Sequence, residues 1–168
     1  MGAMATPFQL FRQTVQLRVL GWLRIPLLSA VRPTLVALDE AHCVVKVPLR
    51  RFTRNHLGSM YFGALAIGAD CAGGLLAVEL IRRRRAGLAL VFKAFKADFL
   101  KRPEGDVYFT CADGPAITAL VEQTLATGER QTGPVRVTGA VRMADGSMET
   151  VAEFTLELSL KKSEKAVL

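Results

Sequence analysis

The segment from Asn55 to Glu79, NHLGSMYFGALAIGADCAGGLLAVE, constrains what this chain can fold into more than any other part of it. It begins as a polar turn and continues as a long run of small and apolar residues, with one carboxylate, Asp70, near its middle. Burying a carboxylate without a partner is costly. Asp70 is therefore either bonded to neighbouring backbone or hydroxyl groups, or part of a functional site. We treat it as the leading candidate for a functional residue.

The apolar run from Met60 to Ile81 is long enough to cross a bilayer. It contains Asp70 and Glu79 and is rich in glycine, which favours a helix buried in protein over a transmembrane segment. Arginines interrupt the apolar positions near the N-terminus, so no secretory signal is expected. The sequence therefore predicts a protein without a transmembrane segment.

The composition sets limits on partners and compartment. A length of 168 residues suits one domain with a sizeable core. The hydrophobic fraction of 51% indicates either a generous core or apolar surface buried between subunits. A net charge of +7 favours anionic partners, but no nucleic-acid recognition motif is present, so no nucleic acid is expected. The three cysteines lack zinc-site spacing, which predicts no metal and reduced thiols in a cytoplasmic protein.

Residues 1–29 are predicted to form an N-terminal helical extension, and residues 30–168 a single domain. Thr6-Pro7 is a helix start, with a capping hydroxyl followed by proline at the first helical position. Apolar residues follow at helical spacing: Phe8, Phe11, Val15, Val19 and Trp22. We expect this stripe to pack on the domain; a lid, a dimer contact or a membrane-surface anchor is the alternative.

The rest of the chain predicts an α+β domain with an antiparallel sheet. Expected strands are Thr34–Leu38, His42–Leu49, Leu88–Leu100, a strand through Val107 and Cys111, and a final hairpin; expected helices are a long one from about Ser59 to Arg83 and a short one over Ala116–Thr127. In the hairpin, apolar and polar residues alternate on both sides of the turn at Asp145-Gly146. Such alternation means one covered face, and the long helix is the obvious cover.

One pattern carries a resemblance to a known family. It comprises Asn55, Gly58, Tyr61, Phe62 and Gly63, with Asp70 farther along. This resembles the acyl-CoA thioesterases of the phenylacetate-pathway (PaaI) type, whose pattern is Asn-x-x-Gly-x-x-His-Gly-Gly followed by an aspartate in the central helix. The turn LKRPEGD at 100–106 is similar to a strand-end turn of that family. The closest resemblance is to an uncharacterised bacterial branch related to the carboxy-terminal domain of YiiD.

The resemblance implies the hot-dog fold, in which an antiparallel sheet wraps around a long central helix; the N-terminal helix would be an addition. It also implies hydrolysis of an acyl-CoA thioester. Asp70 would be the general base or nucleophile, and Asn55 would orient the water or the carbonyl. Backbone amides near Phe62 and Gly63, in the first turn of the helix, would bind the developing oxyanion. The Tyr61 hydroxyl is a further candidate contact to the substrate.

Two observations keep alternatives open. Tyr61-Phe62 stands where the thioesterases have His-Gly, which favours a non-catalytic acyl-CoA-binding protein as the second hypothesis. Asn55 also suits an Asx turn before the helix. A hot-dog dehydratase is a weaker third hypothesis, because the only histidines, His42 and His56, do not stand where its catalytic histidine is expected.

Basic residues near the ends of the long helix and the following strand are candidates for binding the phosphates of coenzyme A. They are Lys101, Arg102, Arg82 and Arg84. A solvated basic face with capping of the helix end explains most of them, and Lys101 and Arg102 are the better candidates because they lie at the turn of residues 100–106. No cofactor is expected apart from coenzyme A as part of the substrate. Because hot-dog sites lie across a subunit interface, the resemblance implies a homodimer or a dimer of dimers.

Overall fold

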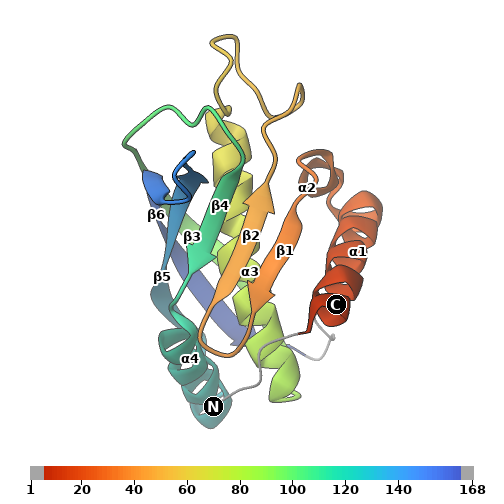
Figure 1. The fold of residues 1–168 in the computed structure, drawn as a ribbon. Helices are drawn as coiled ribbons and strands as arrows, with labels where there is room; N and C mark the ends of the chain where they lie inside the picture. The colour runs from red at the N-terminus through yellow and green to blue at the C-terminus, as the bar shows by residue number, and fades with distance from the viewer. Residues whose placement is uncertain (1–5, 164–168) are drawn as a thin grey trace.

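The computed structural model describes residues 6–163, without the side chains of residues 20–22 and 24. Its elements in chain order are α1 (Pro7–Arg24), α2 (Pro26–Ala30), β1 (Thr34–Leu38), β2 (Cys43–Val47), α3 (Phe62–Arg83), β3 (Leu88–Phe99), β4 (Val107–Cys111), α4 (Gly114–Thr127), β5 (Gln131–Arg142) and β6 (Met148–Lys162). The strands form one antiparallel sheet in the order β1-β2-β4-β5-β6-β3 (Figure 1). The sequence predicted this element order, except for α2, and the antiparallel pairing.

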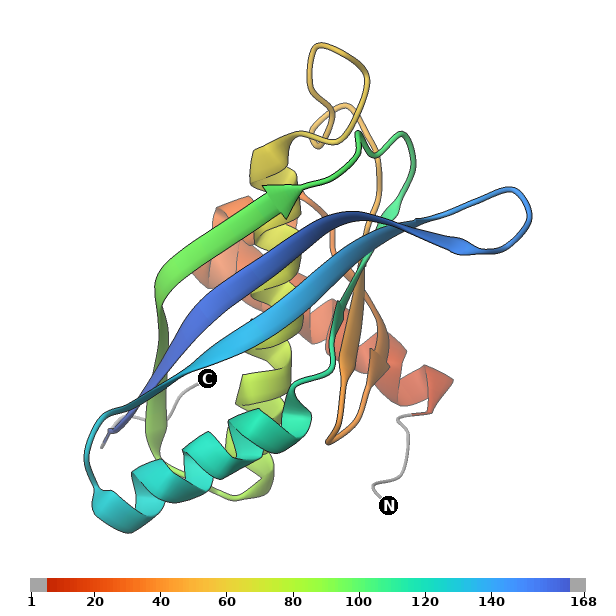
Figure 2. The ribbon, with the colours of Figure 1, turned by 90° about the vertical axis from the view of Figure 1, so that its left-hand side faces the viewer.

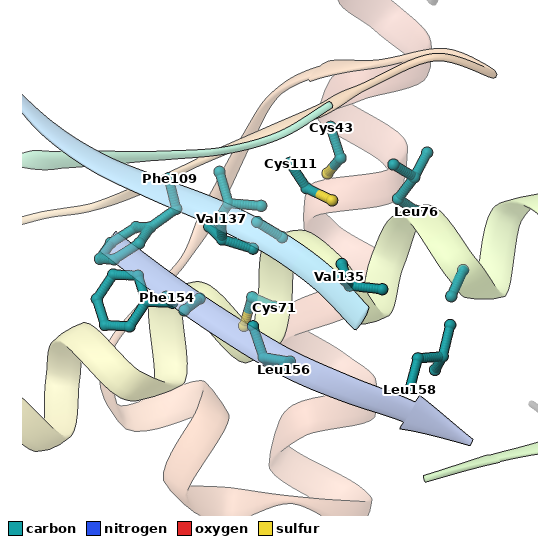
Figure 3. Packing of buried hydrophobic residues seen from close by; sticks show 14 of the residues in the cluster. Cys43, Cys71, Leu76, Phe109, Cys111, Val135, Val137, Phe154, Leu156 and Leu158 are labelled. Atoms are coloured by element: carbon teal, nitrogen blue, oxygen red, sulfur yellow. The ribbon is translucent and has the colours of Figure 1, made fainter. Parts of the chain in front are cut away.

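Helix α3 lies across one face of the sheet, and Figure 2 shows β5, β6 and β3 passing in front of it. Small residues allow the close approach. A Cβ atom at Gly68 would come within 2.2 Å of the Phe109 ring, which is fully buried on β4. Phe154 and Leu156 of β6 extend the same core (Figure 3). A long central helix held by an antiparallel sheet is the hot-dog fold, as predicted.

The start of α3 differs from the prediction. The helix was expected to begin at about Ser59, but it begins at Phe62 with Tyr61 as its N-cap. The Ser59 side chain is engaged elsewhere, because its Oγ accepts a hydrogen bond of 3.0 Å from Asn55 Nδ2. A local side-chain turn has competed with the helix for these residues.

Helix α1 begins where the sequence predicted. Thr6 and Gln9 exchange hydrogen bonds across its first turn: the Thr6 N–H donates to Gln9 Oε1 at 2.8 Å, and the Gln9 N–H donates to Thr6 Oγ1 at 3.4 Å. This is a capping box. Pro7 follows the cap at the first helical position.

The orientation of α1 corrects the prediction. Leu10, Thr14 and Leu17 face the domain, whereas the apolar stripe that begins with Phe8 and Phe11 is exposed. Trp22, the last residue of that stripe, lies outside the described side chains. The helix was expected to turn this stripe inward. It has apolar residues on two opposite sides, however, and the side with fewer of them, which carries Leu10 and Leu17, packs on the domain.

A hydrogen bond explains which side of α1 packs. Thr14 Oγ1 accepts the outward-facing N–H of Leu35 on β1 at 3.1 Å. Strand β1 is the first strand of the sheet, and Figure 1 shows α1 beside it. Helix α1 thus covers one edge of the sheet and satisfies a backbone donor there.

The opposite edge of the sheet is open. Strand β3 pairs only with β6 among the described residues. It is long, and it exposes the large apolar side chains of Val91, Phe95 and Phe99. An open apolar edge of this kind is a site for pairing with another chain. A β-bulge between Phe92 and Phe95 interrupts its pairing with β6.

Helix α3 is the one helix between residues 6 and 163 that is long and apolar enough to cross a membrane. In the protein, 67% of its most hydrophobic 18-residue window is buried. This agrees with the predicted core helix.

Candidate functional site

The turn before α3 is organised by Asn55. Its Oδ1 accepts the Leu57 N–H at 2.9 Å, and its backbone C=O accepts the Gly58 N–H at 3.1 Å. Its Nδ2 donates to Ser59 Oγ. Gly58 has φ +86°, a conformation that glycine adopts without strain. The side chain of Asn55 therefore makes an Asx turn, the alternative that the sequence left open, and its contact with a substrate stays a prediction.

The first turn of α3 presents free backbone donors. The N–H groups of Ala64 and Leu65 both donate to the Tyr61 C=O, at 2.9 and 3.2 Å. The N–H groups of Phe62 and Gly63 have no acceptor among the described residues. They lie at the positive end of the helix dipole. This part of the helix is suited to hold an anion or a developing oxyanion.

Tyr61 and Gly63 fit each other sterically. A Cβ atom at Gly63 would lie 2.6 Å from Cε1 of Tyr61, so the tyrosine ring rests over the glycine. The same ring lies 4.6 Å, between centroids, from the ring of Phe62. Both aromatic side chains are exposed. Tyr61 and Phe62, which stand where the thioesterase pattern has His-Gly, therefore pack together beside the free N–H groups of the first turn of α3.

Asp70 belongs to a row of residues along α3. The row, spaced by four, is Phe62, Ala66, Asp70 and Gly74. Both ends of the row meet β3: the Phe62 ring lies 6.4 Å from the Phe99 ring, and a Cβ at Gly74 would lie 3.8 Å from the Phe92 ring. Asp70 thus faces the stretch of β3 that contains the bulge. Bulges often occur next to active sites.

The Asp70 carboxylate has no hydrogen bond or ion pair with any residue between 6 and 163. Its side chain is exposed in the isolated chain, and partial desolvation by the surrounding protein raises its pKa above the ordinary value for aspartate. The alternative of an acid held by backbone or hydroxyl groups is not what the structure shows. An unpaired carboxylate with a raised pKa is a stronger base than an ordinary aspartate.

An aromatic cluster lies beside this row. The Phe95 and Phe99 rings lie 5.7 and 6.2 Å from the Phe154 ring, and Phe99 also contacts Phe62. Phe95 and Phe99 pair with Leu156 and Ala152, which face the core, so both rings point to the α3 side of the sheet. They remain about half exposed. The cluster offers an apolar surface next to Asp70, although the sequence showed only the individual phenylalanines.

Lys101 and Arg102 lie at the amide end of α3, because the neighbouring Pro103 C=O accepts the Met60 N–H at 2.9 Å. Lys101 forms an ion pair with Glu149. Arg102 is exposed and makes no ion pair within the described residues.

Arg82 and Arg84 lie at the other end of the helix. Arg82 pairs with Glu79 at 2.8 Å, and Arg84 with Glu122 at 3.4 Å. Because α3 has 22 residues, its two ends are roughly 33 Å apart. The four basic residues predicted to bind coenzyme A therefore do not form one cluster within a chain.

Comparison with known proteins places this geometry in a family. Residues 14–160 match the family described as Domain of unknown function (DUF4442). The match begins at Thr14, inside α1. No curated protein matches the sequence significantly.

Solved structures share the fold. A "putative thioesterase" from Shewanella oneidensis has 15% identity and a TM-score of 0.73, covering 90% of this chain and 99% of its own. A protein of unknown function from Pseudomonas aeruginosa, described as a probable thioesterase, has 21% identity and a TM-score of 0.70, covering 89% and 96%. The PaaI protein of the phenylacetic acid degradation operon of E. coli has 18% identity and a TM-score of 0.60, covering 95% and 99%.

At these identities the likeness concerns the fold. The family match covers most of the sequence. It includes the antiparallel sheet, α3 and the turn at Asn55, which together make up the fold. The chain belongs to the DUF4442 family and has the hot-dog fold.

Proposed function

We propose that this protein is an acyl-CoA thioesterase in which Asp70 is the catalytic carboxylate. The observation that carries the proposal is the unpaired Asp70 carboxylate with its raised pKa, in a helix whose first-turn amides are free. A general base works best when its pKa approaches the operating pH. The names of the structural neighbours from Shewanella and Pseudomonas support a thioester as substrate.

The chemistry is a hydrolysis. Asp70 accepts a proton from a water molecule as the water oxygen attacks the thioester carbonyl carbon. The N–H groups of Phe62 and Gly63 stabilise the oxyanion that forms. Its collapse breaks the C–S bond and releases the coenzyme A thiolate, which takes up a proton, together with the carboxylic acid. The aromatic cluster of Phe62, Phe95 and Phe99 receives the acyl group, and Lys101 and Arg102 bind phosphate.

The two halves of this site come from different chains in the proposal. Asp70 lies eight residues beyond Phe62, about 12 Å along the helix axis. One thioester carbonyl does not reach both groups of the same helix. Pairing of two β3 edges would set two copies of α3 side by side, so that Asp70 of one chain meets the amides of the other. We therefore propose a homodimer, or a dimer of dimers, as the active form.

The second candidate is a non-catalytic acyl-CoA-binding protein. It is favoured by one observation: Tyr61 and Phe62 place two exposed rings, tilted against each other, beside the free amides, where the thioesterase pattern has histidine and glycine. These rings narrow the approach of a carbonyl group to the free amides.

A panel of acyl-CoA substrates with a free-thiol readout tests the proposal. We expect turnover by the wild type and a loss of about 100-fold or more in Asp70→Asn. Asp98→Asn is the matched control, because Asp98 is an exposed carboxylate on β3 that pairs with Lys96. Equal turnover by Asp70→Ala and wild type would remove Asp70 from the mechanism.

Two further measurements test the role of Asp70 and separate the two candidate functions. Single turnover in ¹⁸O-labelled water places the label in the acid product if Asp70 acts as a base, but in the enzyme if it acts as a nucleophile. Calorimetry that shows acyl-CoA binding without turnover supports the binding protein, and absence of binding contradicts both candidates.

A further inference from the structure

The outer face of α1 and α2 is apolar and uncovered. On α1 the exposed apolar side chains are Phe8, Phe11, Val15, Val19 and Leu23, with exposed fractions between 44% and 70%. Their spacing puts them on one side of the helix. Ile25 and Leu27 continue the exposed apolar surface at α2. Figure 1 shows α1 at the rim of the molecule, with β1 on its inner side. We name these seven residues the α1–α2 face.

The sequence of α1 and α2 carries charge of one sign only. The first acidic residue of the sequence is Asp39, whereas Arg12, Arg18, Arg24 and Arg32 precede it. Arg12 lies four residues after Phe8 and three before Val15, within the apolar side of the helix. A second copy of the chain placed on this face would bring like charges together. An anionic surface would be attracted to it.

A basic pocket adjoins α1 beside the residues that follow α2. It has a volume of about 400 Å³, and its charged lining consists of Arg18, Arg32, Lys46, Arg50 and Asp106. Asp106 is engaged by Lys46 at 3.3 Å and by the Leu49 N–H at 2.9 Å. Burial lowers the pKa of Arg18, and the charges of Arg32 and Arg50 lower it further. The pocket therefore holds more positive charge than its one carboxylate balances.

The backbone at Arg32 adds to this picture. Arg32 follows α2 and has φ +52°, a left-handed conformation in which glycine is the unstrained residue. The chain nevertheless places a guanidinium group there, at the wall of the pocket. Arg32 makes no ion pair with any described residue, which leaves its side chain able to meet an anion.

We propose that the α1–α2 face docks the protein on a bilayer of anionic phospholipid. The apolar side chains of α1 enter the boundary between headgroups and acyl chains, as in other interfacial amphipathic helices. Arg12 reaches toward the headgroups, and the basic pocket binds a lipid phosphate. The open β3 edge lies at the other end of the sheet, so docking leaves the proposed dimer edge free.

Vesicle sedimentation of the full chain tests the proposal. We expect the protein to pellet with vesicles of phosphatidylglycerol and phosphatidylcholine, to bind pure phosphatidylcholine at least ten-fold less, and to be released by salt. Phe8→Ser/Phe11→Ser should lose most of the binding. The matched control is Met143→Ser/Met148→Ser, two exposed apolar residues at the β5–β6 turn, which should bind as the wild type does.

Arg32→Gly separates the anion contact from folding. Glycine relieves the left-handed backbone, so the thermal unfolding temperature should be equal or higher while vesicle binding weakens several-fold. Unchanged vesicle binding in Arg32→Gly would remove the pocket from the proposal.

Other occupants give distinct results. Absence of sedimentation with anionic vesicles overturns the proposal. Stabilisation of the protein against thermal unfolding by soluble glycerol 1-phosphate, without vesicle binding, also overturns it. That result would make the pocket a site for a free phosphate ester. A drop in the oligomeric mass of Phe8→Ser/Phe11→Ser, measured by light scattering without vesicle binding by the wild type, would assign the face to a second copy.

Discussion

At the scale of single residues, Asp70 combines two properties that conflict in a purely structural side chain. It has no partner among the described residues, and burial raises its pKa. An ionised group in this position weakens folding, because the folded state binds the proton more tightly than the unfolded state does. Such a cost is typical of functional sites, where stability is exchanged for activity.

The Asp70→Asn variant tests this conflict. Because the pKa is raised in the folded state, ionisation disfavours folding, and the penalty is full above the folded-state pKa. It disappears below the ordinary aspartate pKa of about 3.9. We expect a higher thermal unfolding temperature than wild type at pH 7 and no difference near pH 3, measured by calorimetry. A lower unfolding temperature at pH 7 would show that the carboxylate has a stabilising partner.

The same raised pKa predicts the pH dependence of activity. The rate should rise with pH as Asp70 loses its proton, with a midpoint above the ordinary aspartate value. The profile of kcat/KM between pH 4 and 8 measures it. A midpoint at or below about pH 3.9 would contradict the assignment.

Glycines of α3 have different roles that a matched pair of variants separates. Gly68→Ala forces a methyl group into the Phe109 ring and should lower the free energy of unfolding by about 1–3 kcal/mol. Gly74→Ala meets only ordinary contact with Phe92 and should raise it by about 0.5–1 kcal/mol. Urea unfolding measures both. Equal effects would mean that the helix packs less tightly on β4 than described.

At the scale of elements, the two ends of α3 differ in their electrostatics. The first turn leaves amides free, whereas the last turn is closed by a charge cluster. Burial would raise the pKa of Glu79, but hydrogen bonds from Arg82 and Arg83 outweigh it and hold the pKa below the ordinary value. Arg83 also reaches Glu40 after β1 at 2.9 Å. One end is fixed for stability, and the other is available for binding.

Glu79→Gln should destabilise the protein at pH 7 by about 1–3 kcal/mol, since it breaks charge-assisted hydrogen bonds of a buried side chain. The lowered pKa means that this stabilisation is present above the unfolded-state pKa of about 4.3 and is lost as pH falls through the folded-state value. Urea unfolding at pH 7 and pH 3 measures it.

The control is Glu122→Gln. The ion pair between Glu122 and Arg84 lies at the surface and should contribute no more than about 0.5 kcal/mol to the free energy of unfolding. If the difference in unfolding free energy between Glu79→Gln and Glu122→Gln were the same at pH 7 and pH 3, the stabilisation by Glu79 would not be electrostatic.

At the scale of the whole molecule, the two edges of the sheet are treated differently. Helix α1 covers β1 and satisfies the Leu35 N–H. Strand β3 stays open and exposes apolar side chains. An uncovered edge of twelve residues invites pairing with a second copy. The fold therefore has one edge closed by α1, whose outer side is the α1–α2 face, and one open edge at β3.

Val91→Lys tests the edge. Lysine at an edge strand opposes pairing, so light scattering should show a dimer for the wild type and a shift to monomer for the variant, with loss of thioesterase activity. Val36→Lys on β1 is the matched control, because Val36 is similarly exposed at the covered edge. A monomeric wild type with full activity would contradict a site shared between chains.

The sequence by itself determined the features that depend on near neighbours. Alternation in the final hairpin predicts an antiparallel sheet with one covered face, and the small residues around Asp70 predict a helix packed on it. Pro7 at the start of α1 and Gly128 after α4, with φ +72°, fix helix ends locally. These signals were sufficient for the fold and for Asp70 as the candidate.

Tertiary structure decided what local patterns leave open. Helix α1 is apolar on two sides. The side that packs is the one from which Thr14 accepts the Leu35 N–H and Arg18 donates to Pro33 and Thr34. Ser59 is drawn into the turn of Asn55, which moves the start of α3 to Phe62 and thereby chooses which amides are free. The tertiary structure likewise separates the basic residues: it places Lys101 and Arg102 at one end of α3, whereas Arg82 and Arg84 lie at the other. Periodicity fixes what a segment becomes, but the partner surfaces fix which face it buries.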